Sequence, residues 1–101
     1  MEGKHHPKSQ EDFLAGLAFY DGRSIDVGDD FLREFDETVD AIRQNPETRA
    51  VIWQDVRERE MPRFPFNLVY VCRKNVLRIM AVAHHSRRRW YWKKRLKDLN
   101  P

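Results

Sequence analysis

The sequence predicts an α+β fold in which an N-terminal helical hairpin packs on a three- or four-stranded antiparallel sheet, with a short helix at the C-terminus. Apolar residues recur at helical spacing over about residues 9–20 and 29–44, and short β-prone runs follow Pro46. The chain has 101 residues, of which 41% are hydrophobic, so there is material for one small core. We therefore expect a single domain spanning residues 1–101.

Each predicted helix combines an apolar stripe with a terminal signal. In the first helix, Phe13 and Leu17 lie four residues apart, and Ser9 is a candidate N-cap. The second helix is expected to end before Pro46, because proline cannot continue a helix. The turn-rich link at residues 21–28 is short enough for an antiparallel hairpin.

The predicted strands are arranged around one apolar run. Residues 64–72 are apolar at both odd and even positions, which favours a central strand with Pro65 at its start. The polar sequence Arg73-Lys74-Asn75 predicts a hairpin turn. The other predicted elements are strands over residues 50–53, 56–61 and 76–83 and a helix over residues 90–99.

Charge is divided unevenly along the chain. Residues 1–60 contain 8 Lys/Arg and 15 Asp/Glu, whereas residues 61–101 contain 11 Lys/Arg and one acid. Two interpretations stay open: the halves neutralise each other across the fold, or the basic half forms a face for an anionic partner. Arginines, lysines and tryptophans are concentrated in residues 87–95, which makes this segment the candidate binding surface.

Several classes of function are disfavoured. The single cysteine, Cys72, cannot form an intramolecular disulfide, and its apolar neighbours favour an inert core thiol. The pairs His5-His6 and His84-His85 do not predict a metal site, because adjacent strand residues point to opposite faces. No apolar run is long enough to span a bilayer. We expect a cytoplasmic protein with no cofactor, metal or membrane partner.

Two motifs in the last third of the chain carry a family resemblance. The first is Arg-Phe-Pro-Phe at residues 63–66, followed by Val-Tyr at residues 69–70. The second is Ala-Val-Ala-His at residues 81–84, followed by Arg87, Trp92 and Arg95. With His-Pro at residues 6–7, they resemble the RelE/ParE superfamily of bacterial toxins from type II toxin–antitoxin systems, which includes plasmid stabilisation proteins.

The resemblance covers about residues 6–96 and implies a growth-inhibiting toxin that is neutralised by a cognate antitoxin. It implies a compact domain, as a homodimer or as a heterotetramer with the antitoxin. ParE-like members inhibit DNA gyrase by binding, whereas RelE-like members cleave mRNA at the ribosome. The ParE-like branch is favoured here, and a homologue that only binds an antitoxin-like partner is a third alternative.

The chain departs from the family pattern in two places. Only residues 1–5 precede the His-Pro element, and they give little β signal, so the usual first strand is expected to be short or missing. Arg89 stands where the family often has a proline, which adds charge beside Trp90 and Trp92.

The resemblance also suggests candidates for ribonuclease chemistry. Cleavage without a metal requires cations to offset phosphate charge and groups that move the ribose proton. The candidate catalytic residues are Arg57, Arg59, His85, Arg87 and Tyr91. Residues 57–60 read Arg-Glu-Arg-Glu, so the arginines serve only if they, and not the glutamates, share the active face.

A wider set of residues is expected to contact a macromolecular target. This set comprises Arg63, Arg87, Arg88, Arg89, Trp90, Trp92, Lys93, Lys94 and Arg95. Arg63 has an alternative structural role as the ion-pair partner of Asp36 or Asp40 on the second helix. The residues Trp90, Tyr91 and Trp92 cannot all face inward, so at least one is expected to be exposed or covered by a partner.

Overall fold

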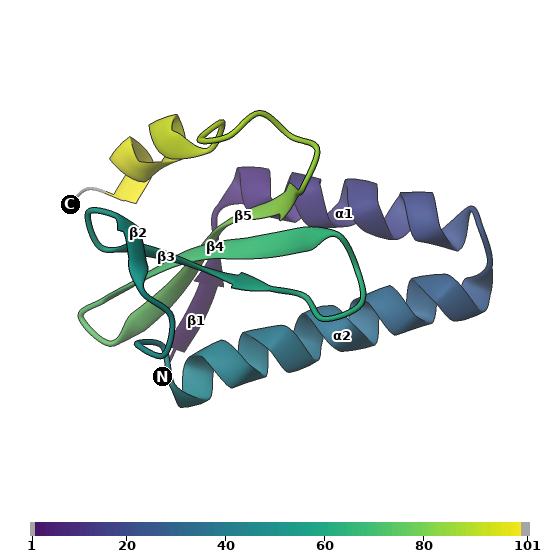
Figure 1. The fold of residues 1–101 in the computed structure, drawn as a ribbon, viewed down its shortest axis with the longest axis horizontal. Helices are drawn as coiled ribbons and strands as arrows, with labels where there is room; N and C mark the ends of the chain where they lie inside the picture. The colour runs from purple at the N-terminus through teal and green to yellow at the C-terminus, as the bar shows by residue number, and fades with distance from the viewer. Residues whose placement is uncertain (1, 100–101) are drawn as a thin grey trace.

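The computed structural model describes residues 2–99, in which a first strand is followed by a helical hairpin, four further strands and a C-terminal 3-10 helix (Figure 1). The elements are β1 (Glu2–His5), α1 (Pro7–Asp21), α2 (Ile25–Gln44), β2 (Val51–Trp53), β3 (Val56–Glu60), β4 (Phe66–Arg73), β5 (Val76–His84) and η1 (Lys93–Leu99). The α+β class predicted from the sequence is therefore confirmed.

The sheet has five strands in the order β1-β5-β4-β3-β2. Strands β2 to β5 pair antiparallel, but β1 pairs parallel with β5, so the sheet is mixed. The prediction of three or four antiparallel strands was wrong in this respect. The first strand is present despite its weak β propensity, because β5 offers it an edge, with Glu2 opposite Val76 and His5 opposite Ile79.

Both helices begin earlier than the sequence predicted. Helix α1 begins at Pro7, and its N-cap is His6, whose Nδ1 accepts a hydrogen bond from the Lys8 amide at 3.0 Å. Ser9, the expected cap, lies buried in the first turn. Helix α2 begins at Ile25, because the hydroxyl of Ser24 caps the amide of Val27 at 3.1 Å.

The ends of the other elements follow from local backbone geometry. Helix α2 ends at Gln44, as Pro46 predicted. In the turn between β4 and β5, Lys74 and Asn75 have φ of 52° and 60°, the conformation of a two-residue hairpin turn. The last helix is a 3-10 helix that begins at Lys93, three residues later than expected, because Trp90 has φ 69° and cannot be part of a right-handed helix.

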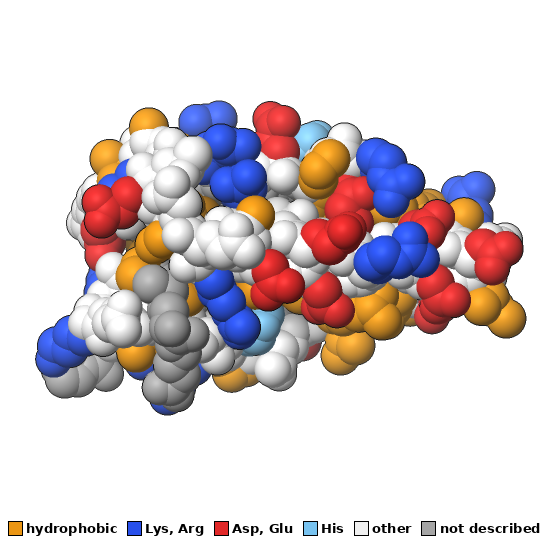
Figure 2. Space-filling model, turned by 90° about the horizontal axis from the view of Figure 1, so that it is seen from below, with side chains coloured by type: hydrophobic (Ala, Val, Ile, Leu, Met, Phe, Trp, Pro, Cys, Tyr) orange, Lys and Arg blue, Asp and Glu red, His pale blue; other side chains and the backbone are white. Residues whose placement is uncertain are grey.

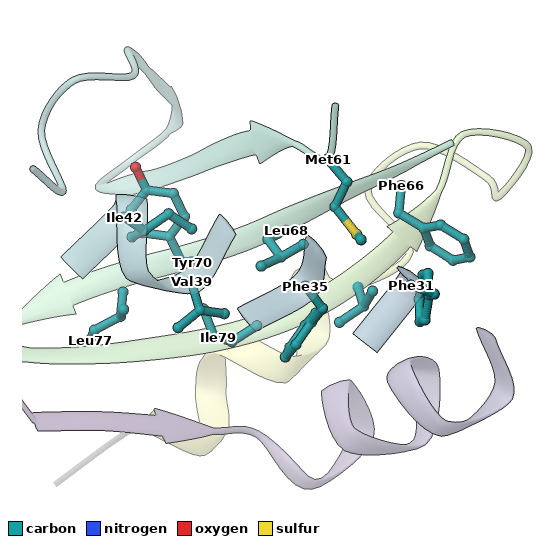
Figure 3. Close-up of a cluster of buried hydrophobic side chains, with 11 residues drawn as sticks. Phe31, Phe35, Val39, Ile42, Met61, Phe66, Leu68, Tyr70, Leu77 and Ile79 are labelled. Carbon is teal, nitrogen blue, oxygen red and sulfur yellow. The ribbon is translucent and has the colours of Figure 1, made fainter. Parts of the chain in front are cut away.

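Two hydrophobic clusters lie on opposite faces of the sheet. The larger one fills the space between the helical hairpin and the sheet and includes Phe31 and Ile42 (Figure 3). The smaller one includes Val69 and Met80 and is covered by the C-terminal segment through Trp92, which is 4% exposed.

Strand β4 contributes to both clusters, since Leu68 and Tyr70 join one and Val69 and Val71 the other. The prediction of a central strand is thus confirmed. No helix in the part of the chain that the structure describes is long and apolar enough to cross a membrane.

Candidate functional site

The carboxylate of Asp12, on α1, lies at the centre of the region that holds the C-terminal segment. It accepts hydrogen bonds from the Val82 amide at 3.1 Å and from the Tyr91 hydroxyl at 3.1 Å. It also accepts from both terminal nitrogens of Arg95, at 2.7 and 3.3 Å. These bonds join α1, β5 and the C-terminal segment, and we call Asp12, Tyr91 and Arg95 the Asp12 cluster.

Burial makes the Asp12 cluster a structural unit. The side chains of Asp12 and Arg95 are 8% and 11% exposed, and Arg95 also donates to the carbonyl of Met80 at 3.0 Å. Burial, together with the charge and hydrogen bond of Asp12, raises the pKa of Tyr91 to about 12. Arg95 therefore has a structural role, and the Tyr91 hydroxyl donates a hydrogen bond to a carboxylate.

Aromatic rings support the cations of the loop that follows β5. The guanidinium carbon of Arg87 lies 3.8 Å from the centre of the Tyr91 ring, and that of Arg89 lies 4.6 Å from the Trp90 ring. The ammonium of Lys93 lies 4.4 Å from the Trp53 ring and 4.6 Å from the Trp90 ring. Such cation–π contacts restrict long side chains, so these charges are held in defined positions.

Next to this loop, a pocket of about 320 Å³ opens on the sheet face formed by β3 and β4. Both Glu58 and Glu60 line it, together with Asn67, His85 and Arg87. The pocket therefore places two carboxylates beside the cations of the loop. Arg88 and Arg89 line the same pocket, so the two glutamates weaken its attraction for a phosphate without cancelling it.

Strand alternation places Arg57 and Arg59 on the opposite face from Glu58 and Glu60. Arg57 donates to the carbonyls of Arg49 and Glu47, in the link between α2 and β2. The structure therefore does not bring Arg57 or Arg59 together with the other ribonuclease candidates. Of the two arrangements left open by the Arg-Glu-Arg-Glu sequence, the glutamates share the face with Arg87.

The two adjacent histidines differ in their surroundings. His85 is exposed, and its Nε2 lies 2.9 Å from Oδ1 of Asn67, at the pocket wall. His84 packs edge-on against Phe66 and hydrogen bonds to Ser86. Both histidines line the pocket, and His85 is the more exposed of the two.

Arg63 connects the start of the β4 region to α2. Its backbone amide and its Nε donate to the two carboxylate oxygens of Glu34, at 2.6 and 2.9 Å. Glu34 is 3% exposed, whereas the Arg63 side chain is 63% exposed. The predicted ion pair with α2 exists, but Glu34 replaces Asp36 and Asp40, which lie on the exposed side of the helix.

The remaining candidates are divided between core and surface. Trp92 is buried against the sheet, whereas Trp90 and Tyr91 are half-buried. Arg88, Arg89 and Lys94 are exposed. The surface available to a target is therefore formed by Arg87, Arg88, Arg89, Trp90, Lys93 and Lys94, which we call the basic loop surface.

Sequence reasoning missed the roles of Asp12 and Glu34. Both helices contain several acids. An acid that faces the core can be the direct sequence neighbour of one that faces solvent, so helical spacing alone does not identify the buried one. Among residues 2–99, no group of three or more His, Cys, Asp or Glu side chains could hold a metal ion.

Comparison with known proteins shows which solved structures have a similar fold. No protein-family model matches the chain, and no curated protein matches it either. Among solved structures, it is similar to a chain of the "Chromosomal ParDE TA system from P. aeruginosa", with a TM-score of 0.56 and 19% identity. The similarity covers 83% of this chain and 95% of that chain. This chain has the fold of a ParDE component.

Proposed function

We propose that this protein is the toxin of a bacterial type II toxin–antitoxin system that acts in the cytoplasm by binding DNA gyrase and is neutralised by a cognate antitoxin. The fold, similar to that of a ParDE component, supports the toxin assignment. The observation that favours binding over catalysis is the position of Glu58 and Glu60 in the pocket beside Arg87.

Three features of the pocket disfavour RNA cleavage. Its two glutamates oppose the negative charge of a scissile phosphate. The strand cations Arg57 and Arg59 lie on the other face, so among the described residues that line the pocket only the loop arginines Arg87, Arg88 and Arg89 offset the glutamates. The hydroxyl of Tyr91, with a pKa raised to about 12, donates to Asp12 and is poorly placed to accept a ribose proton. The basic loop surface is left as a contact surface.

A supercoiling assay with purified gyrase and purified protein tests the proposal. We expect the protein to inhibit supercoiling, and the double variant Arg88→Glu/Arg89→Glu to lose inhibition at least tenfold. Arg23→Glu changes an exposed arginine in the link between α1 and α2, and is expected to inhibit like the wild type. Normal supercoiling in a large excess of wild-type protein would reject the gyrase assignment.

A second function, ribosome-dependent mRNA cleavage, is favoured by one observation. His85 and Arg87 line the same pocket, and Arg87 stacks on Tyr91. Pulse-labelled protein synthesis after induction separates the two functions, because mRNA cleavage stops labelling within minutes whereas gyrase inhibition first stops cell division. If synthesis collapses, Arg87→Ala and Tyr91→Phe should restore it; if both variants remain fully toxic, these residues are not catalytic.

A further inference from the structure

A groove of about 660 Å³ lies between the beginning of α1 and the C-terminal segment. It adjoins the pocket that contains Glu58 and Glu60 and shares Arg87, Arg88, Trp90 and Tyr91 with it, but neither glutamate lines it. Seven Lys and Arg side chains line it: Arg95, which pairs with Asp12, and the six cations Lys8, Arg87, Arg88, Lys93, Lys94 and Lys97.

The positive charge of this groove is not neutralised by the fold. Within residues 2–99, none of the six cations forms an ion pair with a carboxylate. Arg95 also borders the groove, but Asp12 neutralises it. The one acid that lines the groove, Asp98, lies 2.8 Å from Nε2 of His6. A cleft lined by charges of one sign concentrates its field on a ligand of the opposite sign.

The aromatic residues of the groove act as supports for its cations. The Tyr91 ring packs against Arg87 and Arg95, whose guanidinium carbons lie 3.8 and 5.0 Å from its centre. The Trp90 ring packs against Arg89 and Lys93. Because cations pack against these rings, less ring surface is left for stacking with a nucleic-acid base, and the groove presents mainly charge.

We propose that this groove binds the phosphate backbone of nucleic acid, with little preference for sequence. Every lining side chain is ionisable or aromatic, so the groove lacks the aliphatic anchors typical of a protein interface. Cations without carboxylate partners are available to phosphates, and the ring contacts of Arg87 and Lys93 lower the entropic cost of ordering those two side chains on binding. The inference does not depend on gyrase binding, because DNA binding by this groove can be measured with the protein alone.

Fluorescence anisotropy with a short labelled DNA duplex tests the proposal, with the affinity measured over a series of salt concentrations. The double variant Lys94→Gln/Lys97→Gln removes two exposed cations of the groove. We expect it to bind about tenfold more weakly at low salt and to reduce the slope of log affinity against log salt by about 2. The control Arg23→Gln/Lys74→Gln removes the same charge from exposed positions outside the groove and should bind like the wild type.

Three outcomes would overturn the proposal. The first is an equal loss of affinity in the two double variants, which would show that net charge alone attracts the DNA. The second is binding of a poly-glutamate peptide as tight as that of the duplex, which would show a general site for anions. The third is the absence of duplex binding at low salt by wild-type protein with a native circular dichroism spectrum.

A single-stranded DNA probe should bind with a salt slope about three-quarters that of the duplex.

Discussion

At the scale of single residues, the molecule depends on two buried carboxylates that each organise a segment. Asp12 holds the C-terminal segment through Tyr91 and Arg95, and Glu34 holds the residues before β4 through Arg63. A buried charge is tolerated only when its hydrogen-bond partners are in place. Substitutions at these carboxylates are therefore expected to be more damaging than substitutions at the exposed acids of the same helices.

Replacement of Asp12 by asparagine should destabilise the protein by about 3 kcal/mol, because it leaves the buried guanidinium of Arg95 without a charge partner. Urea denaturation followed by circular dichroism measures the free energy of unfolding. Glu11→Gln, at an exposed position of the same helix turn, is the control and should change stability by less than about 0.5 kcal/mol. Equal stability of the two variants would show that the Asp12 cluster contributes little.

The raised pKa of Tyr91 predicts how stability varies with pH in alkaline solution. Its pKa in the folded protein is about 12, above the ordinary value of 10.0, so the neutral hydroxyl is favoured by folding. The corresponding contribution to stability is complete below pH 10 and is lost as the pH rises through 12. Between these values, wild-type protein should lose more stability in urea denaturation than Tyr91→Phe. Parallel curves for the two proteins would contradict this assignment.

At this scale, the sequence predicted that Arg63 could form an ion pair with α2, but it did not predict which acid is the partner. The sequence indicated that Arg63 could pair with Asp36 or Asp40 of α2, whereas its partner is Glu34, which lies within two helical turns of both. Which of them faces inward depends on the rotation of the helix against the sheet, and that rotation is decided by the packing of Phe31 and Phe35. The choice of ion-pair partner therefore depends on tertiary packing and cannot be predicted from local residue spacing.

At the scale of elements, strong periodicity and turn chemistry gave correct predictions, and weak signals did not. The two helices, the central strand and the turn at residues 73–75 were recognised because several local features agreed at each place. Strand β1 was expected to be short or missing because Gly3, Lys4 and His5 have little β propensity. Its formation depends on the edge of β5, more than 70 residues away in the sequence.

The turn between β4 and β5 offers a stabilising substitution. Lys74 and Asn75 both adopt positive φ, and Asn-Gly is the preferred sequence for such a turn. The double variant Lys74→Asn/Asn75→Gly should therefore raise the free energy of unfolding by about 1 kcal/mol. A thermal unfolding scan would show this as an increase in Tm. The single variant Lys74→Gly, which gives the reverse order Gly-Asn, serves as the comparison and should give a smaller gain.

At the scale of the whole molecule, charge is separated in space as well as in sequence. Acidic side chains gather along α2 on the face shown in Figure 2, whereas the cations of the C-terminal segment line a groove beside the start of α1. Of the two interpretations left open by the sequence, the structure supports a distinct basic face, because six cations of that groove have no carboxylate partner within residues 2–99.

The C-terminal segment also completes the fold, since it covers the second hydrophobic cluster. A variant truncated after Arg89 would expose Val56, Val69 and Met80 on the open face of the sheet. Loss of Trp92 alone is expected to cost about 3–5 kcal/mol, which is a large part of the stability of a small domain. The truncated protein should bind a hydrophobic dye and aggregate, whereas full-length Lys94→Gln/Lys97→Gln should remain folded and monodisperse.

The Asp12 cluster has a consequence for the rates of folding and unfolding. Its hydrogen bonds join residues that are 70, 79 and 83 positions apart, and contacts over such distances form after local ones because closing a long loop costs entropy. A contact formed late in folding acts mainly on the unfolding rate. In stopped-flow measurements, Asp12→Asn should thus speed unfolding by about two orders of magnitude while refolding stays nearly unchanged. One carboxylate on the first helix would then govern how long the folded protein persists.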